Sequence, residues 1–204
     1  MKKLLVFLLV LLMIASAALA EFNIAALRED PDFYMRDIPG SVDTLYCSVN
    51  PPYQGELNEG YDGELVVYMD YMTLVDAEAT VPRLMVSTVA YDQALNADRL
   101  RMTIGGKTYT FVVTHVESEY DGVYMEDYTT LLVGEGLNML KAIAQQKKDN
   151  PIPVELQCLG ETVFAGQVVL PGEAAADLYD RWIDLGGKQQ NLKPLEALWP
   201  CEKK

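Results

Sequence analysis

RLRMTIGGKTYTFVVTHV, residues 99–116, is the stretch that decides the predicted fold. Its Gly105-Gly106 pair is typical of a two-residue hairpin turn, because glycine adopts positive φ angles without a Cβ clash. Such a turn places Met102 opposite Tyr109, and the apolar side chains of the two arms then share one face. Arginine and threonine fill the other face, and a shift of one residue would mix the two sets. Turn and pattern therefore predict the same antiparallel hairpin.

Similar runs, rich in β-branched and aromatic residues, occur on both sides of this hairpin. Asp121-Gly122 is a second two-residue turn signal, so the chain is expected to return beside the first hairpin after it. A third hairpin is predicted about Gly160-Glu161. The expected strands besides the opening hairpin are residues 44–49, 64–75, 81–91, 123–133, 152–159 and 162–170.

The hydrophobic period changes to that of a helix at two places, near residues 136–148 and 173–185. Short strands with frequent turn signals favour a mainly β fold, an antiparallel β-sandwich of the immunoglobulin type or similar, with these two helices at its edge or end. The alternative is an α+β fold with a single antiparallel sheet and both helices on one face.

The first twenty residues have the layout of a secretory signal peptide. Lys2 and Lys3 precede an apolar run over residues 4–14, and Ala18-Leu19-Ala20 supplies the small residues of a cleavage site. The run is shorter than the ~20 apolar residues of a spanning helix, which is the competing interpretation. We therefore expect residues 1–20 to be removed and residues 21–204 to form one β-rich domain that is secreted, periplasmic or attached to the cell surface.

The acidic composition narrows the choice of partners. Without the two N-terminal lysines, 14 basic residues face 30 acidic ones, a net charge of −16. Such a charge favours solubility and argues against nucleic acid or an anionic membrane as the partner. The acidic residues are scattered, which is typical of a solvated surface.

Export permits disulfides, but three cysteines leave at least one thiol unpaired. Cys47 and Cys158 each alternate with apolar neighbours, so both are expected to face the core. Cys201 lies in the C-terminal tail, and we expect any disulfide to involve it. The wide spacing of the three excludes a CxxC-type metal site.

His115 is the only histidine of the chain. The register of the two hairpins places it opposite Tyr128, on the apolar face. Without a second histidine or a nucleophile motif, we expect a structural, half-buried histidine rather than a catalytic base or a metal ligand.

Alternating carboxylates at Glu117, Glu119 and Asp121, with Glu126 and Asp127 beyond the turn, are the candidate ligands for calcium. Calcium takes 6–8 oxygen ligands, and the spacing of an EF-hand loop is not present here. A charged hairpin tip explains these residues as well. The sequence therefore predicts no metal and no cofactor.

Four tyrosines lie in or beside predicted loops and are the candidate binding residues: Tyr53, Tyr61, Tyr120 and Tyr124. Exposed aromatic rings stack on sugars or anchor protein partners, although tyrosine is also a favourable strand residue. No GxSxG, P-loop, GxGxxG or HExxH motif occurs. The leading hypothesis is an exported, non-enzymatic protein that binds a protein or a glycan. The alternatives are a secreted hydrolase that uses a carboxylate pair and a structural or assembly subunit.

Overall fold

The protein is mainly β, with three short helices among the residues described. The computed structural model describes residues 22–38, 41–49, 53–57, 63–74, 79–91, 93–146 and 150–188. The helices are α2 (Ile24–Glu29), α3 (Glu135–Ala144) and α4 (Gly172–Asp184). The strands are β1 (Phe33–Asp37), β2 (Thr44–Ser48), β3 (Tyr53–Leu57), β4 (Gly63–Leu74), β5 (Ala79–Tyr91), β6 (Arg99–Ile104), β7 (Lys107–Val112), β8 (Thr114–Tyr120), β9 (Val123–Leu131), β10 (Pro151–Cys158) and β11 (Glu161–Val169).

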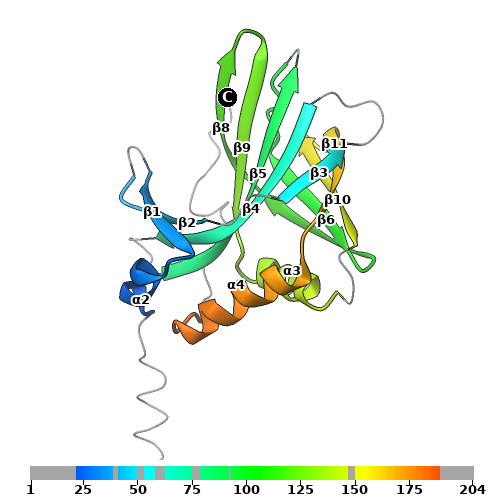
Figure 1. Ribbon diagram of the computed structural model, residues 1–204. Helices are drawn as coiled ribbons and strands as arrows, with labels where there is room; N and C mark the ends of the chain where they lie inside the picture. Colours follow the sequence, from blue (N-terminus) through cyan, green and yellow to red (C-terminus); the bar gives the residue numbers. More distant parts are fainter. Residues whose placement is uncertain are drawn as a thin grey trace, which may run out of the picture.

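Nine strands form one antiparallel sheet that curls into a half-barrel (Figure 1). Their order is β7-β6-β10-β11-β3-β4-β5-β9-β8, and β2 and β1 branch from β4. The mainly β prediction is confirmed, but the two-sheet sandwich is not what the structure has. Pairings between segments far apart in the chain, such as β3 with β11, join what would have been two sheets into one.

Strand β4 is the point at which the sheet forks. One of its edges pairs with β5 over its whole length. The other edge is shared, because Val67 in its first half pairs with Tyr53 of β3 and Tyr71 in its second half pairs with Tyr46 of β2. One long strand therefore belongs to two lobes of the sheet.

Two of the three predicted hairpins have the expected register. Met102 lies opposite Tyr109 across the Gly105-Gly106 turn, and Tyr120 lies opposite Val123 across the second turn. The third turn is wrong by one residue, because its central residues are Leu159 and Gly160 rather than Gly160 and Glu161. Both have positive φ angles, 52° and 91°, and a bulge between Leu156 and Gln157 absorbs the shift in register.

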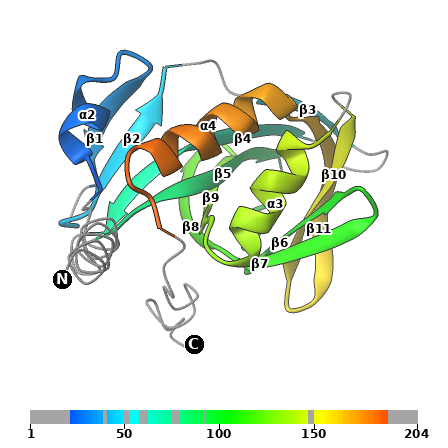
Figure 2. The same ribbon diagram turned by 90° about the horizontal axis from the view of Figure 1, so that it is seen from below.

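Helices α3 and α4 lie side by side across one end of the half-barrel (Figure 2). The Tyr71 hydroxyl donates a hydrogen bond of 2.6 Å to the Leu178 carbonyl, and the Trp182 indole donates one of 2.8 Å to the Thr80 carbonyl. Both helices occur where they were predicted. Gly186 follows the end of α4 with a φ of 92°, which is typical of a glycine that terminates a helix. None of the described helices has the length and apolar character needed to cross a membrane.

Arg181 of α4 fastens the N-terminal segment to the rest of the fold. Its guanidinium group forms ion pairs with Asp30 and Asp32, and it lies 5.5 Å from the centre of the Phe33 ring. Asp30 and Asp32 directly follow α2, so the side chain of Arg181, from a distant part of the chain, holds this short helix in place.

Two of the cysteines, Cys47 and Cys158, are not bonded to each other and lie in different environments. Cys47 is buried on the outer face of the sheet, which is the face opposite the main core. Burial raises the pKa of its thiol, and the carboxylate of Asp70 adds to the rise. Cys158 is only half-buried at the end of β10. Cys201 lies outside the described residues, so a disulfide that involves it stays a prediction.

A buried ion pair crosses the outer face where the sheet forks. Asp70 of β4 lies directly opposite Arg83 of β5, and the two residues are only 3% and 4% exposed. The guanidinium group donates two hydrogen bonds, of 2.6 and 2.5 Å, to the two carboxylate oxygens. Burial raises the pKa of the Asp70 carboxyl, and the guanidinium of Arg83 opposes that rise.

We predict that Arg83→Met destabilises the protein by about 3–5 kcal/mol, because it leaves the Asp70 carboxylate buried without its partner. The double variant Asp70→Leu/Arg83→Met is expected to recover most of the loss, since it removes both charges. Urea denaturation of the two variants measures this. A double variant no more stable than Arg83→Met would contradict the interpretation.

Candidate functional site

The β8–β9 hairpin carries the candidate site because it is both projecting and unpaired on one side. It extends beyond the neighbouring strands at one end of the sheet, away from the helices (Figure 1). Among the described strands, β8 pairs with β9 and with no other. Alternate N–H and C=O groups of an edge strand point away from its neighbour. Here a two-residue turn closes on the pair Tyr120 and Val123, so the outward groups belong to His115, Glu117 and Glu119.

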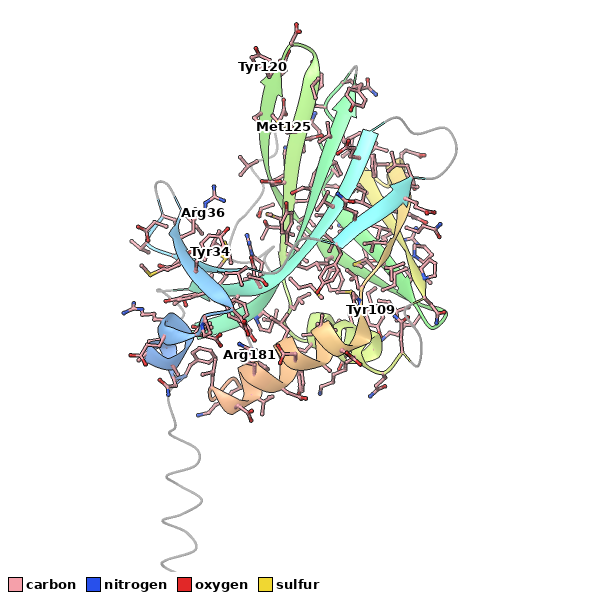
Figure 3. All side chains as sticks on the ribbon, viewed as in Figure 1. Tyr34, Arg36, Tyr109, Tyr120, Met125 and Arg181 are labelled. Atoms are coloured by element: carbon pink, nitrogen blue, oxygen red, sulfur yellow. The ribbon has the colours of Figure 1, made fainter. Side chains whose placement is uncertain are left out.

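The outer face of the hairpin carries several exposed apolar side chains, with Ser118 and Asp127 between them. Tyr120 and Val116 of β8 are 79% and 74% exposed, and Met125 of β9 and Tyr91 of β5 are also exposed. Tyr91, Val123 and Tyr120 lie in one row across three strands, because Val123 pairs with both tyrosines. Figure 3 shows Tyr120 and Met125 on this hairpin. We call Tyr91, Val116, Tyr120, Val123 and Met125 the outer patch.

The inner face of β8 is charged. His115, Glu117 and Glu119 alternate along it and pair with Tyr128, Glu126 and Tyr124 of β9. His115 lies opposite Tyr128 as predicted, with ring centroids 5.6 Å apart. His115 is exposed rather than half-buried, because β8 is the last strand of the sheet and no other described strand lies against the edge that faces away from β9. The expectation that His115 is half-buried is therefore wrong, although its face and its partner are as predicted.

Glu126 is completely buried, at 0% exposure, on the inner face of β9. Its Oε1 atom accepts hydrogen bonds from the Asn96 amide at 2.9 Å and from the Tyr128 hydroxyl at 2.7 Å. Its Oε2 atom accepts one from the Leu95 amide at 2.7 Å. The carboxylate thus binds the connection between β5 and β6 to the inner face of the sheet.

Tyr128 lies beneath this carboxylate and completes the arrangement. Its hydroxyl donates to Glu126 and accepts a hydrogen bond of 3.3 Å from the Ala97 amide. Burial raises the pKa of Tyr128 well above its ordinary value, and the hydrogen bond to Glu126 raises it further. The phenol is therefore a fixed neutral donor rather than an acid or a base at ordinary pH.

The connection held by Glu126 also reaches the two edges of the sheet. The Asp98 carbonyl accepts a hydrogen bond of 3.2 Å from the Val113 amide, and the Asp98 amide donates one of 2.9 Å to Gln157 of β10. Val113 is the single residue between β7 and β8, which are the two ends of the strand path. Residues 95–98 thus connect β9, β10 and the junction between β7 and β8.

His115, Glu117 and Glu126 form a cluster of metal-ligating groups. One ligand atom from each lies within 4.8 Å of those from the other two, and no other such group of three or more occurs among the described residues. Of the three main calcium candidates, Glu117 belongs to this cluster. Glu119, further along β8, and Asp121, in the turn with a φ of 52°, do not.

The four candidate tyrosines have different surroundings. Tyr120 is fully accessible in the outer patch, and Tyr124 is half-buried on the inner face of β9. Tyr53 lies in β3, a strand that was expected to be a loop, where its partly buried ring packs against the main core. Tyr61 lies outside the described residues.

The sequence interpretation named Glu126 only as an acidic residue beyond the main calcium candidates, and it missed the burial of this carboxylate and its hydrogen-bond donors. The predicted register already placed it on the inner face of β9, between Tyr124 and Tyr128. A lone carboxylate in such a series is a signal, because a buried charge requires dedicated hydrogen-bond donors. The position of those donors, on the connection before β6, is set by the tertiary fold and has no local signature.

We predict that Tyr128→Phe lowers the free energy of unfolding by about 1–3 kcal/mol, because it leaves the Ala97 amide without an acceptor and removes one donor from Glu126. Tyr120→Phe is the matched control, since its ring is exposed, and no change is expected. Chemical denaturation of the two variants checks this. Equal stabilities would show that the hydroxyl of Tyr128 does not support the connection.

Comparison of the chain with protein-family models, curated proteins and solved structures finds no match. What the protein does is therefore inferred from its own residues and contacts.

Proposed function

We propose that the protein is an exported, non-enzymatic binding protein whose β8 edge takes up an extended segment of a partner protein. The observation that carries the proposal is the outer edge of β8, with which no other described strand pairs, next to the exposed apolar side chains of the outer patch. An extended peptide adds to such an edge through main-chain hydrogen bonds, while its alternate side chains contact the two faces of the hairpin.

The charge on β8 indicates what kind of segment fits. Glu117 and Glu119 are exposed on one face of the strand, and the outer patch provides Val116 and Tyr120 on the other. A strand with alternating basic and apolar side chains complements both faces. A partner strand of this kind is favoured over a glycan, since the outer patch includes methionine and valine besides tyrosine.

The same charges disfavour pairing between two copies of this edge. Antiparallel association of β8 with itself would bring glutamates of the two copies together on one face, and like charges across a strand pair are destabilising. Inward-pointing charges are a common protection of edge strands against such association. The expected partner is therefore a different protein.

A hydrolase with a carboxylate pair has weaker support. Glu117 and Glu126 lie directly opposite each other, as two such carboxylates would. Glu126 is completely buried, however, and accepts three hydrogen bonds that hold a backbone connection. A general acid or nucleophile must touch its substrate, which the burial of this carboxylate does not favour.

The test uses synthetic peptides of about seven residues, the length of a strand such as β8. A peptide that alternates lysine and valine is expected to bind the purified protein, and one that alternates glutamate and valine is not. Added salt should weaken the binding, because the attraction is between exposed charges. Glycan arrays provide the comparison, and binding to glycans without binding to the lysine peptide would contradict the proposal.

Two variants of Glu119 locate the binding on β8. Glu119→Lys is expected to reverse the preference between the two peptides. Glu119→Pro removes an N–H group that points away from β9, and it should weaken binding by about tenfold or more while the hairpin persists. Unchanged peptide affinities in both variants, with unchanged melting temperatures, would place the binding elsewhere.

A further inference from the structure

We infer that His115, Glu117 and Glu126 bind a divalent transition metal ion of the zinc class. One imidazole nitrogen and two carboxylate oxygens are ligands of this class of ion. The three ligand atoms lie within 4.8 Å of one another on two adjacent strands. This inference rests on residues of the inner face of the hairpin, and it does not depend on the proposed partner.

The charges around Glu126 indicate a cation. Glu117 lies directly opposite Glu126 in the strand pairing, an arrangement of like charges that costs stability. All three hydrogen-bond donors of Glu126 are neutral, two amides and a phenol. Among the described residues, neither glutamate forms an ion pair with lysine or arginine. A bound metal ion neutralises both carboxylates.

Glu126 is prepared for the role of a fixed ligand. Three hydrogen bonds set the plane of its carboxylate, as the surroundings of a metal site orient its ligands. Oε1 accepts two of them and Oε2 only one, so one lone pair of Oε2 remains for the ion. The Tyr128 ring lies against His115 and limits the positions of the imidazole.

The other two ligands have the freedom to close the site. Bonds from zinc to nitrogen and oxygen are about 2.0–2.2 Å, so ligand atoms around one ion lie about 3.0–3.6 Å apart. The separations of up to 4.8 Å require a movement inward. His115 and Glu117 are both exposed on the edge strand, and rotation of their side chains supplies it.

The donor set selects among metal ions. Calcium takes 6–8 oxygen ligands and gains little from an imidazole. Three protein ligands are one fewer than a closed structural zinc site has, so water completes the coordination on the exposed side. The site is therefore expected to prefer zinc over calcium and to exchange its metal with solution.

The experiment titrates the purified, tag-free protein with zinc chloride and follows the NMR signals of its imidazole, which is unique because the chain has a single histidine. One equivalent of zinc is expected to shift the His115 signals and to raise the melting temperature, with reversal by EDTA. Calcium chloride at the same concentration should do neither. His115 signals that do not respond to zinc would overturn the inference.

Matched variants separate the site from other zinc ligands. His115→Gln and Glu117→Gln are each expected to weaken zinc binding, measured by calorimetry, by about tenfold or more. Both residues are exposed, so the variants should remain folded. Glu119→Gln, on the same face but outside the cluster, should bind zinc as the unaltered protein does. Zinc binding that persists in His115→Gln would assign the metal to other groups, such as the thiols, and would also overturn the inference.

Discussion

The hydrogen bonds between the Glu126 carboxylate and the amides of Leu95 and Asn96 are the interaction on which the rest of the fold depends. The connection from β5 to β6 joins two strands that lie far apart in the sheet order, and its residues 93–97 belong to no strand. A completely buried carboxylate is costly unless it is fully hydrogen-bonded, and here the connection supplies the donors. The Glu126 carboxylate and the backbone of residues 95 and 96 therefore stabilise each other, because each would be buried without a hydrogen-bond partner if the other were absent.

This anchoring accounts for a half-barrel in which, among the described strands, β7 and β8 at the two ends each pair on one side only. Residues 93–98 bind Glu126 on β9, Val113 between β7 and β8, and Gln157 on β10. Strands β7 and β8 meet at Val113 but lie at the two ends of the strand order, and they do not pair with each other. The outer edge of β8 brings together three features: outward backbone groups, an outer face with exposed apolar side chains and a charged inner face. Partner binding, as proposed, would use both faces of this strand, and metal binding would use its inner face, so Glu117 takes part in both.

Local signals predicted the parts of the fold that are local. Gly105-Gly106 and Asp121-Gly122 fixed the registers of two hairpins, and that register correctly placed His115 opposite Tyr128. The predicted sandwich was wrong because strand alternation does not specify which distant strands pair with each other. Strand β3 joins β11 to β4, and it was not predicted as a strand because its neighbours in the sequence are prolines and glycines. The predicted half-burial of His115 was wrong for the same reason, because β8 lies at the edge of the sheet. Of the cluster, both glutamates were named as calcium candidates, whereas the burial and the donors of Glu126 depend on the tertiary position of residues 93–98.

Hydrogen exchange at the amides of Leu95 and Asn96 tests the central role of Glu126 most directly. These two amides donate to a side chain rather than to a strand ladder, so any protection they have comes from that carboxylate. Slow exchange, comparable with that of the ladder amides in β9, is expected in the unaltered protein, with a local loss of protection in Glu126→Gln. Rapid exchange in the unaltered protein, like that of the exposed Gly105-Gly106 turn, would contradict the account.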